Sequence, residues 1–317
     1  MKLKYAIGVD LGGTKIKLGI VTSEGRIVKK DSIPTLANEG VDKSISQIKK
    51  GISNLLKGNK NLISGIGIGS PGVVSLKKGT VENPPNLPGW GKVHLGRIIS
   101  KEFSLPTFVE NDANAAAIGE LIYGKGKKLN SFIMITLGTG VGGGIIYDKK
   151  LFRGDLGGAG EIGHLTIDIN GPKCNCGSRG CIEAYVGNNY FITNVKKKLE
   201  SVKESKIFEL IDNNLENLSP KTIHDASLLN DEFSIKMIEE MGQNLGFGLA
   251  SIVNVLDITN VIIGGGVSGF GKILFDSTKN SIKSRVLTPL KSRVNVYPAN
   301  LKNNAGVKGA SSLVFYS

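Results

Sequence analysis

The sequence lacks the segments that carry a chain into or across a membrane. No run reaches the length of a spanning helix, about 18 apolar residues, and the N-terminus shows no apolar stretch with a small-residue cleavage site behind it. The pattern Gly-x-x-x-x-Gly-Lys-Ser/Thr is also absent, as is a Rossmann glycine motif inside a βαβ unit. We therefore expect a cytoplasmic protein without a membrane partner, which is neither a P-loop nor a Rossmann protein.

Cysteine is scarce, because the 317 residues include only 3, at positions 174, 176 and 181. An odd number packed this tightly does not suit a disulfide framework and indicates a metal site instead. Buried reduced thiols are the alternative, which the clustering of the cysteines around glycines makes the less favourable interpretation.

Acidic residues are few beside the basic ones, with 27 Asp and Glu against 40 Lys and Arg and a net charge of +13. A basic surface suits nucleic acids, anionic lipids or small anionic substrates. The lysines are spread along the chain, however, and form only short clusters such as Lys196–Lys198. This distribution favours a solvated surface over a nucleic-acid face, and we expect no nucleic-acid partner. The length allows two domains and a substantial core.

The first part of the sequence predicts an antiparallel meander followed by alternating helices and strands. The expected elements are strands over 5–10, 15–21, 26–30, 63–68 and 106–109 and a helix over 41–57. A second helix is expected after its N-cap Asp112 and before its stop Gly124. Residues 83–91 are rich in Pro and Gly, and they predict an ordered loop with Trp90 as its anchor.

A second meander is predicted from Ser131, and it repeats the first. When the sequence is shifted by 126 positions, Leu11 falls on Leu137 and Gly12 on Gly138. In both places a strand runs into a glycine turn and then a second strand, which predicts two domains built to one plan and facing each other. The remaining expected elements are a strand over 260–263 and helices over 200–232, 233–256, from about 270, and over 304–317.

Three glycine turns that follow predicted strands suit the binding of phosphate. Backbone N–H groups can surround a phosphate only where no side chain blocks the approach, and glycine meets that condition. The turns lie at Asp10–Lys15, Gly138–Gly144 and Gly264–Val267. Tight hairpins without a ligand are the alternative, which explains one such turn more readily than three. The set therefore predicts nucleotide binding.

Asp112 is the candidate general base for phosphoryl transfer to a hydroxyl group. Such a reaction needs an aligned acceptor, neutralised phosphate charge and a group that takes the hydroxyl proton. Asp112 follows a strand end, precedes a helix and sits beside Asn111, which can hydrogen-bond a sugar. A helix cap is the alternative role, and a cap alone would tolerate Asn or Ser at this position.

These motifs together resemble a known family. The segment Asp10–Lys15 is similar to the first phosphate motif of actin-like ATPases, and the run from Leu137 to His164 is similar to the signature of the ROK family. That family comprises bacterial glucokinases, related hexose kinases and sugar-responsive repressors. The resemblance extends from Asp10 to Val307. It implies an α/β, actin-like ATPase (ribonuclease H-like) fold with two duplicated α/β domains around a central cleft. The implied domains are 1–112 plus 303–317, the smaller, and 113–302, the larger.

The resemblance implies a glucokinase that phosphorylates the 6-hydroxyl of glucose with ATP, Mg²⁺ and a structural Zn²⁺, and Asp112 as its base. The implied sugar-binding residues are Gly72, Asn111, Asp112, Glu161, His164 and Glu183. The implied nucleotide-binding residues are Asp10, Gly12, Gly13, Thr14, Lys15, Gly138, Thr139, Gly140, Gly265 and Gly266, with Asp10 holding Mg²⁺ through water. The implied zinc ligands are His164, Cys174, Cys176 and Cys181. The loop Asn86–Trp90 looks like the family's sugar-side loop.

Other functions stay open within the family. Fructose, mannose or N-acetylmannosamine could replace glucose, and Ser75 stands where many relatives carry an acid, so the preferred hexose is open. Polyphosphate is an alternative donor that the basic charge would suit. A sugar-responsive repressor or a non-catalytic sugar-binding protein is a further alternative. The first phosphate turn begins at Asp10, so we expect no DNA-binding domain ahead of it. Homodimers are common in the family, and we expect one here.

Overall fold

The computed structural model describes residues 4–58, 60–75 and 79–316. Within these residues the strands form two five-stranded sheets and one three-stranded sheet. The strands are β1 (Tyr5–Leu11), β2 (Lys15–Thr22), β3 (Ile27–Pro34), β4 (Ile63–Ser70), β5 (Val73–Ser75), β6 (Thr80–Glu82), β7 (Lys92–Val93), β8 (Thr107–Asn111), β9 (Phe132–Leu137), β10 (Val141–Tyr147), β11 (Lys150–Phe152), β12 (Asn260–Gly264) and β13 (Asn295–Pro298).

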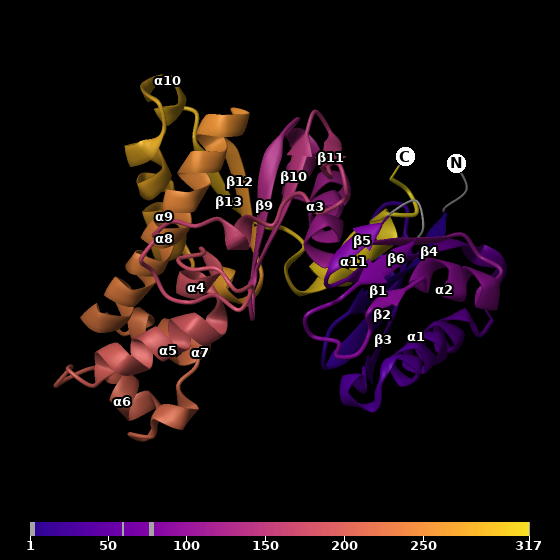
Figure 1. Cartoon of the computed structure of the whole chain (residues 1–317), viewed down its shortest axis with the longest axis horizontal. Helices are drawn as coiled ribbons and strands as arrows, with labels where there is room; N and C mark the ends of the chain where they lie inside the picture. The colour runs from indigo at the N-terminus through magenta and orange to yellow at the C-terminus, as the bar shows by residue number, and fades with distance from the viewer. Residues whose placement is uncertain (1–3, 59, 76–78, 317) are drawn as a thin grey trace. The chain divides into compact units, whose positions relative to one another are not determined.

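Helices alternate with the later strands of each half of the chain (Figure 1). They are α1 (Val41–Leu56), α2 (Leu95–Phe103), α3 (Asp112–Tyr123), α4 (Glu183–Val186), α5 (Asn188–Leu199), α6 (Lys206–Leu210), α7 (Pro220–Leu228), α8 (Glu232–Leu256), α9 (Lys272–Arg285), α10 (Thr288–Lys291) and α11 (Ala305–Ser312). Short 3-10 turns include η5 (Ile162–His164) and η7 (Gly266–Phe270). In the described part of the chain, no helix combines the length and apolar character that a membrane crossing requires.

The first sheet begins as the predicted meander and continues in parallel. Its order is β3-β2-β1-β4-β8, with β1 and β2 antiparallel, β2 and β3 antiparallel, and β1, β4 and β8 parallel. Alternate residues of a strand face opposite sides of a sheet. Large apolar residues on one side, such as Ile7, Val9 and Ile66, join the buried cluster that includes Ile48 and Ile99 of α1 and α2. One side of this sheet is therefore covered by α1 and α2.

The other side of the first sheet carries glycines, and α11 packs on it. A Cβ atom on Gly8 of β1 would lie 2.0 Å from the carbonyl oxygen of Val307, and one on Gly67 of β4 would lie 1.8 Å from that of Ala310. Helix α11 also crosses α3 closely, because a Cβ atom on Gly309 would lie 2.5 Å from the carbonyl oxygen of Ala115. The last helix of the chain thus closes the first sheet.

The small sheet β5-β6-β7 and the loop after β6 complete this part of the molecule. The predicted loop 83–91 is confirmed as irregular but ordered, since the amide of Asn83 donates to the carbonyl oxygen of Gly91 at 2.7 Å. Leu87 and Trp90 are buried beneath it. Trp90 is therefore the anchor that the sequence predicts.

The second sheet repeats the plan of the first. Its order is β11-β10-β9-β12-β13, with β10 and β11 antiparallel and β9, β12 and β13 parallel. Read in chain order, β9 to β13 take the places of β1, β2, β3, β4 and β8. β1 ends at Leu11 and β9 ends at Leu137, the two residues that the 126-residue shift superposes. The predicted internal duplication is confirmed by this topology.

Helices α8 and α9 pack tightly through small residues. A Cβ atom on Gly242 would lie 2.7 Å from the Cβ atom of Ser277, and one on Gly246 would lie 2.4 Å from that of Ser281. The predicted long apolar helix 233–256 is confirmed as α8. The helix expected from about residue 270 begins at Lys272, because the 3-10 turn η7 comes first.

The chain forms two compact units, each with more contacts within itself than with the other. One unit comprises Met1–Ser131, Gly144–Gly160 and Ala299–Ser317, and the other comprises Phe132–Gly143 and Glu161–Pro298. The domain boundaries expected from the sequence, at residues 112/113 and 302/303, stay a prediction.

Several elements were not expected or end elsewhere. Helices α2 and α5 and strands β5, β6, β7 and β13 were not predicted. Residues 200–232, which were predicted to be helical, contain the short helices α6 and α7, and Pro220 occupies the N1 position of α7. The closing helix ends at Ser312, and Ser317 lies outside the described residues.

We expect Gly67→Ala to destabilise the first unit by about 1–3 kcal/mol or more, because the added methyl group collides with the α11 backbone, which cannot move aside as a flexible side chain would. Urea-induced unfolding followed by circular dichroism measures the loss. Gly158→Ala is the matched control, since a Cβ atom there meets nothing within 4 Å. Equal stability of the two variants would contradict the close packing of α11.

Candidate functional site

Three predicted site segments of the first unit meet at one edge of its sheet. Asp10 on β1 is paired with Gly69 on β4, and Gly69 is paired with Glu110 on β8. Because the three strands are parallel, their carboxyl ends lie at the same edge, and a Cβ atom on Gly69 would lie 3.6 Å from the Cα atom of Asp112. Open α/β sheets bind ligands at this edge. The structure therefore brings Asp10 and Asp112 together.

The turn between β1 and β2 presents its backbone at the same edge. The amide of Gly12 donates to the carbonyl oxygen of Lys15 at 3.2 Å, which closes the turn. The hydroxyl of Thr35 donates to the carbonyl oxygen of Gly12 at 2.6 Å, and its amide donates to that of Thr14 at 3.0 Å. Thr35 is fully buried and holds the turn from behind, a role that sequence reasoning missed. The side chains of Thr14 and Lys15 are exposed.

The sugar-side loop predicted at 86–90 packs on this turn. A Cβ atom on Gly13 would lie 2.9 Å from the Cβ atom of Asn86 and 3.0 Å from its carbonyl oxygen. A larger residue at Gly13 would push the two segments apart. The glycine is therefore required by the close approach of the loop.

Asn111, not Asp112, is the N-cap of α3, so the predicted cap is wrong. Asn111 has the extended ψ of 144° that a cap residue needs, and its Oδ1 accepts hydrogen bonds from the amides of Ala113 and Asn114. Its Nδ2 donates to the carbonyl oxygen of Gly72 at 3.2 Å. Asp112 is instead the first helical residue, and its Oδ1 accepts from the amide of Ala113 at 2.8 Å.

Asp112 is accessible to solvent at the N-terminus of α3. The protein around it still limits its hydration and raises the pKa of its carboxyl group, while N–H donation from Ala113 and from its own amide opposes the rise. The pKa of Asp10 is also raised, first by burial and then by the negative charge of Asp112. The positive charge of Lys17, the cross-strand partner of Asp10, lowers this pKa in part. The two carboxylates thus form a site that favours a proton or a cation.

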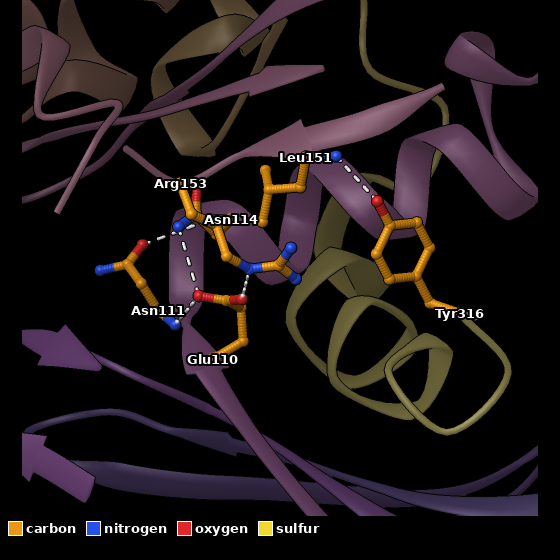
Figure 2. A network of polar contacts seen from close by, with 6 residues as sticks. All are labelled: Glu110, Asn111, Asn114, Leu151, Arg153 and Tyr316. Atoms are coloured by element: carbon orange, nitrogen blue, oxygen red, sulfur yellow. Dashed lines mark hydrogen bonds and ion pairs between the residues drawn. The ribbon is translucent and has the colours of Figure 1, made fainter. Parts of the chain in front are cut away.

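Glu110 is a buried carboxylate directly before the cap residue (Figure 2). Its Oε1 accepts from the amide of Asn111 at 2.9 Å and from Nδ2 of Asn114 at 3.3 Å. Its Oε2 accepts from Nε of Arg153 at 2.9 Å, which forms an ion pair. Sequence reasoning did not single out Glu110 or Arg153, because both partners lie far apart in the chain.

The predicted phosphate-binding turns of the second unit lie side by side. The amide of Gly138 donates to the carbonyl oxygen of Gly140 at 3.0 Å, which closes the turn between β9 and β10. Gly265, at the end of β12, has a φ of 90°, and a Cβ atom on it would lie 2.0 Å from the carbonyl oxygen of Leu137. Thr139, Gly265 and Gly266 are exposed. These two turns therefore offer an accessible, glycine-lined backbone surface.

Glu183 touches the same turn. Its Oε2 accepts from the amide of Val141 at 2.9 Å, and a Cβ atom on Gly140 would lie 2.3 Å from that oxygen. Its Oε1 lies 3.9 Å from Sγ of Cys174. The carboxylate predicted to bind sugar thus also fixes the β9–β10 turn next to the cysteine cluster.

The four predicted metal ligands converge in the second unit. The ligand atoms of His164, Cys174, Cys176 and Cys181 all lie within 4.8 Å of one another, and no disulfide joins the cysteines. The Sγ atoms of Cys176 and Cys181 are 3.7 Å apart, as are Sγ of Cys174 and Nδ1 of His164. A Zn–S bond of about 2.3 Å gives a tetrahedral S–S edge of about 3.8 Å. The set therefore fits a tetrahedral ion such as zinc.

His164 is the last residue of the turn η5, so the cluster of one histidine and three cysteines includes the end of this turn. Nδ1 of His164 faces the thiol groups, so Nε2 is the ring nitrogen left for another partner. Glu161 is the N-cap residue of η5 and is exposed. A Cβ atom on Gly163 between them would lie 2.2 Å from the carbonyl oxygen of Val141, so η5 also packs on β10.

The family of this chain is evident from its similarity to known proteins. Residues 6–316 match the model of the ROK family. The chain belongs to the ROK family. It is 33% identical to a glucokinase of Thermotoga maritima over 313 residues, which are 99% of this chain and 98% of that relative. It is 31% identical to a xylose repressor of Caldicellulosiruptor bescii, over 97% of this chain and 77% of the repressor.

A solved structure of the same family matches this ROK protein closely. The ROK family glucokinase of Streptomyces griseus, in complex with glucose and AMPPNP, superposes with a TM-score of 0.86 at 34% identity, over 98% of each chain. The predicted actin-like ATPase fold is thereby confirmed.

We expect Cys176→Ser to remove the bound metal and to lower the unfolding temperature. Cys176 is exposed, so the change removes a ligand without opening the core. Metal content after dialysis, measured by mass spectrometry, and thermal unfolding check the result. Ser178→Ala is the control, because it leaves the thiol groups in place. A full equivalent of metal in Cys176→Ser would contradict the four-ligand site.

Proposed function

We propose that this ROK protein is an ATP-dependent hexose kinase that phosphorylates the 6-hydroxyl group of glucose or a close relative. The observation that carries the proposal is the meeting of Asp10, the Gly12–Thr14 turn and Asp112 at one sheet edge. The relatives named glucokinase support the choice of hexose and donor.

In this proposal Asp112 takes the proton of the sugar hydroxyl. Its Oδ1 accepts the amide of Ala113, which fixes the rotamer and leaves Oδ2 for the proton. A general base needs a pKa between that of a free carboxylate and the working pH, and the surroundings of Asp112 raise its pKa in that direction. The backbone of Asn111 and the cap hold the carboxylate in place.

The glycine turns and Asp10 are proposed to hold the donor. The amides of Gly12 and Gly138 close their turns. The amides that follow them, those of Gly13 and Thr139, are therefore proposed to donate to phosphate oxygens, as glycine turns permit. When bound, Mg²⁺ supplies positive charge that the phosphates and the two neighbouring carboxylates need. Asp10 is proposed to hold that ion through water, and Gly265 and Gly266 to lie against the adenosine.

The acceptor sugar is proposed to contact Gly72, Asn111, Glu161, His164 and Glu183. Carboxylates accept paired hydroxyl donors, which suits neighbouring sugar hydroxyl groups. His164 is proposed to use Nε2 for the sugar while Nδ1 binds zinc, so that the metal orients the ring. Zinc with four protein ligands has no open position, so its proposed role is structural.

A sugar-responsive regulator is the second candidate, and the similarity to a xylose repressor favours it. The two functions differ in what they do to ATP and to DNA. The test measures the hexose phosphate formed from each of a panel of hexoses, with ATP and then polyphosphate as donor, beside salt-dependent DNA binding. Phosphorylation of a hexose without DNA binding supports the kinase, whereas DNA binding without turnover would refute it. A cytoplasmic homodimer stays our expectation.

Asp112→Asn is expected to lower turnover by roughly a hundredfold or more, the usual loss for a general base. The unfolding temperature should stay equal or rise at neutral pH, because a raised pKa means that the ionised carboxylate is less favourable in the folded chain than in the unfolded one. The control is Asp42→Asn, an exposed aspartate in the first turn of α1. Near-normal turnover of Asp112→Asn would overturn the role of Asp112.

The pH dependence should follow the same carboxyl group. Asp112 must be ionised to accept a proton, and its pKa is raised, so activity should fall on acidification at a pH above the ordinary aspartate value of about 3.9. ¹³C NMR titration of carboxyl groups, compared between the wild type and Asp112→Asn, measures this pKa in the free protein. A value at or below 3.9 would contradict the effect of its surroundings.

A further inference from the structure

Glu110 is the most constrained carboxylate near the proposed base, and no step of the proposed reaction uses it. Its side chain is 1% exposed and accepts hydrogen bonds from three donors, the amide of Asn111, the amide group of Asn114 and the guanidinium of Arg153. Two of these donors belong to the cap and first turn of α3. Glu110 therefore links the end of β8 to the cap and the first turn of α3.

Arg153 comes from a different segment of the chain. It follows β11 and opens the stretch 153–160, which leads covalently into Glu161. The stretch is tied to Arg153, because the amide of Ala159 donates to its carbonyl oxygen at 3.1 Å. The guanidinium carbon lies 5.9 Å from the ring centre of Tyr316, whose hydroxyl accepts from the amide of Leu151 at 2.7 Å (Figure 2).

We propose that the Glu110–Arg153 ion pair is a positioning device that fixes Asn111 and Asp112 at the N-terminus of α3 and ties them to the segment that leads to Glu161. The proposal rests on the proposed hexose kinase function. Neither residue touches substrate in it. Both act through the hydrogen bonds of Glu110 to the cap.

The charge of Arg153 is what keeps Glu110 in this arrangement. A carboxylate buried to this degree is stable only when a cation and hydrogen-bond donors compensate it. Without Arg153, the unpaired carboxylate of Glu110 would turn toward water, and this change would remove an acceptor from Asn111 or Asn114. A displacement of about 1 Å at a reacting group can cost as much as a hundredfold in rate.

A pair that only stabilises the fold would behave differently. Replacement would then lower the unfolding temperature and leave the kinetic constants of the folded protein unchanged. A positioning pair instead affects the turnover number and the KM for hexose, which depend on Asp112 and Asn111. It leaves the KM for ATP unchanged, since Glu110 and Arg153 touch none of the glycine turns.

The experiment uses the full chain with the variants Arg153→Met, Arg153→Lys, Glu110→Gln and the double variant Glu110→Gln with Arg153→Met. The control is Glu102→Gln, which breaks the exposed ion pair of Lys49 and Glu102 in the same unit. Turnover, the KM for each substrate and the unfolding temperature are measured for each. Arg153→Lys keeps the charge and serves as the mild variant if Arg153→Met fails to fold.

We expect Arg153→Met to lose roughly ten- to hundredfold in turnover, with the KM for ATP within about twofold and Arg153→Lys partly restored. In Glu110→Gln the new amide group would face the guanidinium, donor against donor. Removal of Arg153 relieves that conflict, so the double variant should lose less than the product of the single losses. Glu102→Gln should match the wild type.

Unchanged kinetic constants in Arg153→Met beside a lowered unfolding temperature would overturn the proposal, and so would fully multiplicative losses in the double variant. A wild type that phosphorylates no hexose would refute the proposed function alone. The rise in unfolding temperature on adding glucose then becomes the readout. A smaller rise in Arg153→Met than in Glu102→Gln supports the positioning role, and an equal rise overturns it.

Discussion

The parallel pairing of β1, β4 and β8 is the constraint on which the candidate site of the first unit depends. Register between these strands places Asp10, Gly69 and Glu110 in one row, and the chain leaves each strand at the same edge. No side-chain interaction could assemble these segments alone, because they are separated by whole helices in the sequence. The backbone hydrogen bonds of the sheet bring these segments together.

Glycine lets this scaffold close. The first sheet has large apolar residues on the side of α1 and α2 and glycines on the side of α11, so α11 can lie directly on the backbone of β1 and β4. The same device recurs where Gly265 meets β9 and where Gly140 meets Glu183. The glycines therefore have two roles: some form exposed turns, and others allow backbone segments to pack in close contact.

Charged groups act at short range around the two acids. The charge of Asp112 raises the pKa of Asp10, whereas Glu110 is compensated by Arg153 and Glu183 by a backbone amide. Glu110 therefore serves the structure around α3, whereas Glu183 both holds the β9–β10 turn and is proposed to bind the sugar. The cysteine cluster plays a similar supporting part for η5 and the β9–β10 turn.

Much of the fold and the site could be predicted from the sequence because their signals are local. Strand patterns, glycine turns and the clustered cysteines each lie within a few neighbouring residues. The apolar spacing of α8 is continuous along one helix, and the internal repeat is one such local pattern that occurs twice. The tertiary structure alone decided which residue caps α3, how Thr35 supports the first turn and that Arg153 pairs with Glu110. Capping depends on a ψ angle, and the other two contacts join residues brought together only by sheet pairing and packing, which no local pattern records.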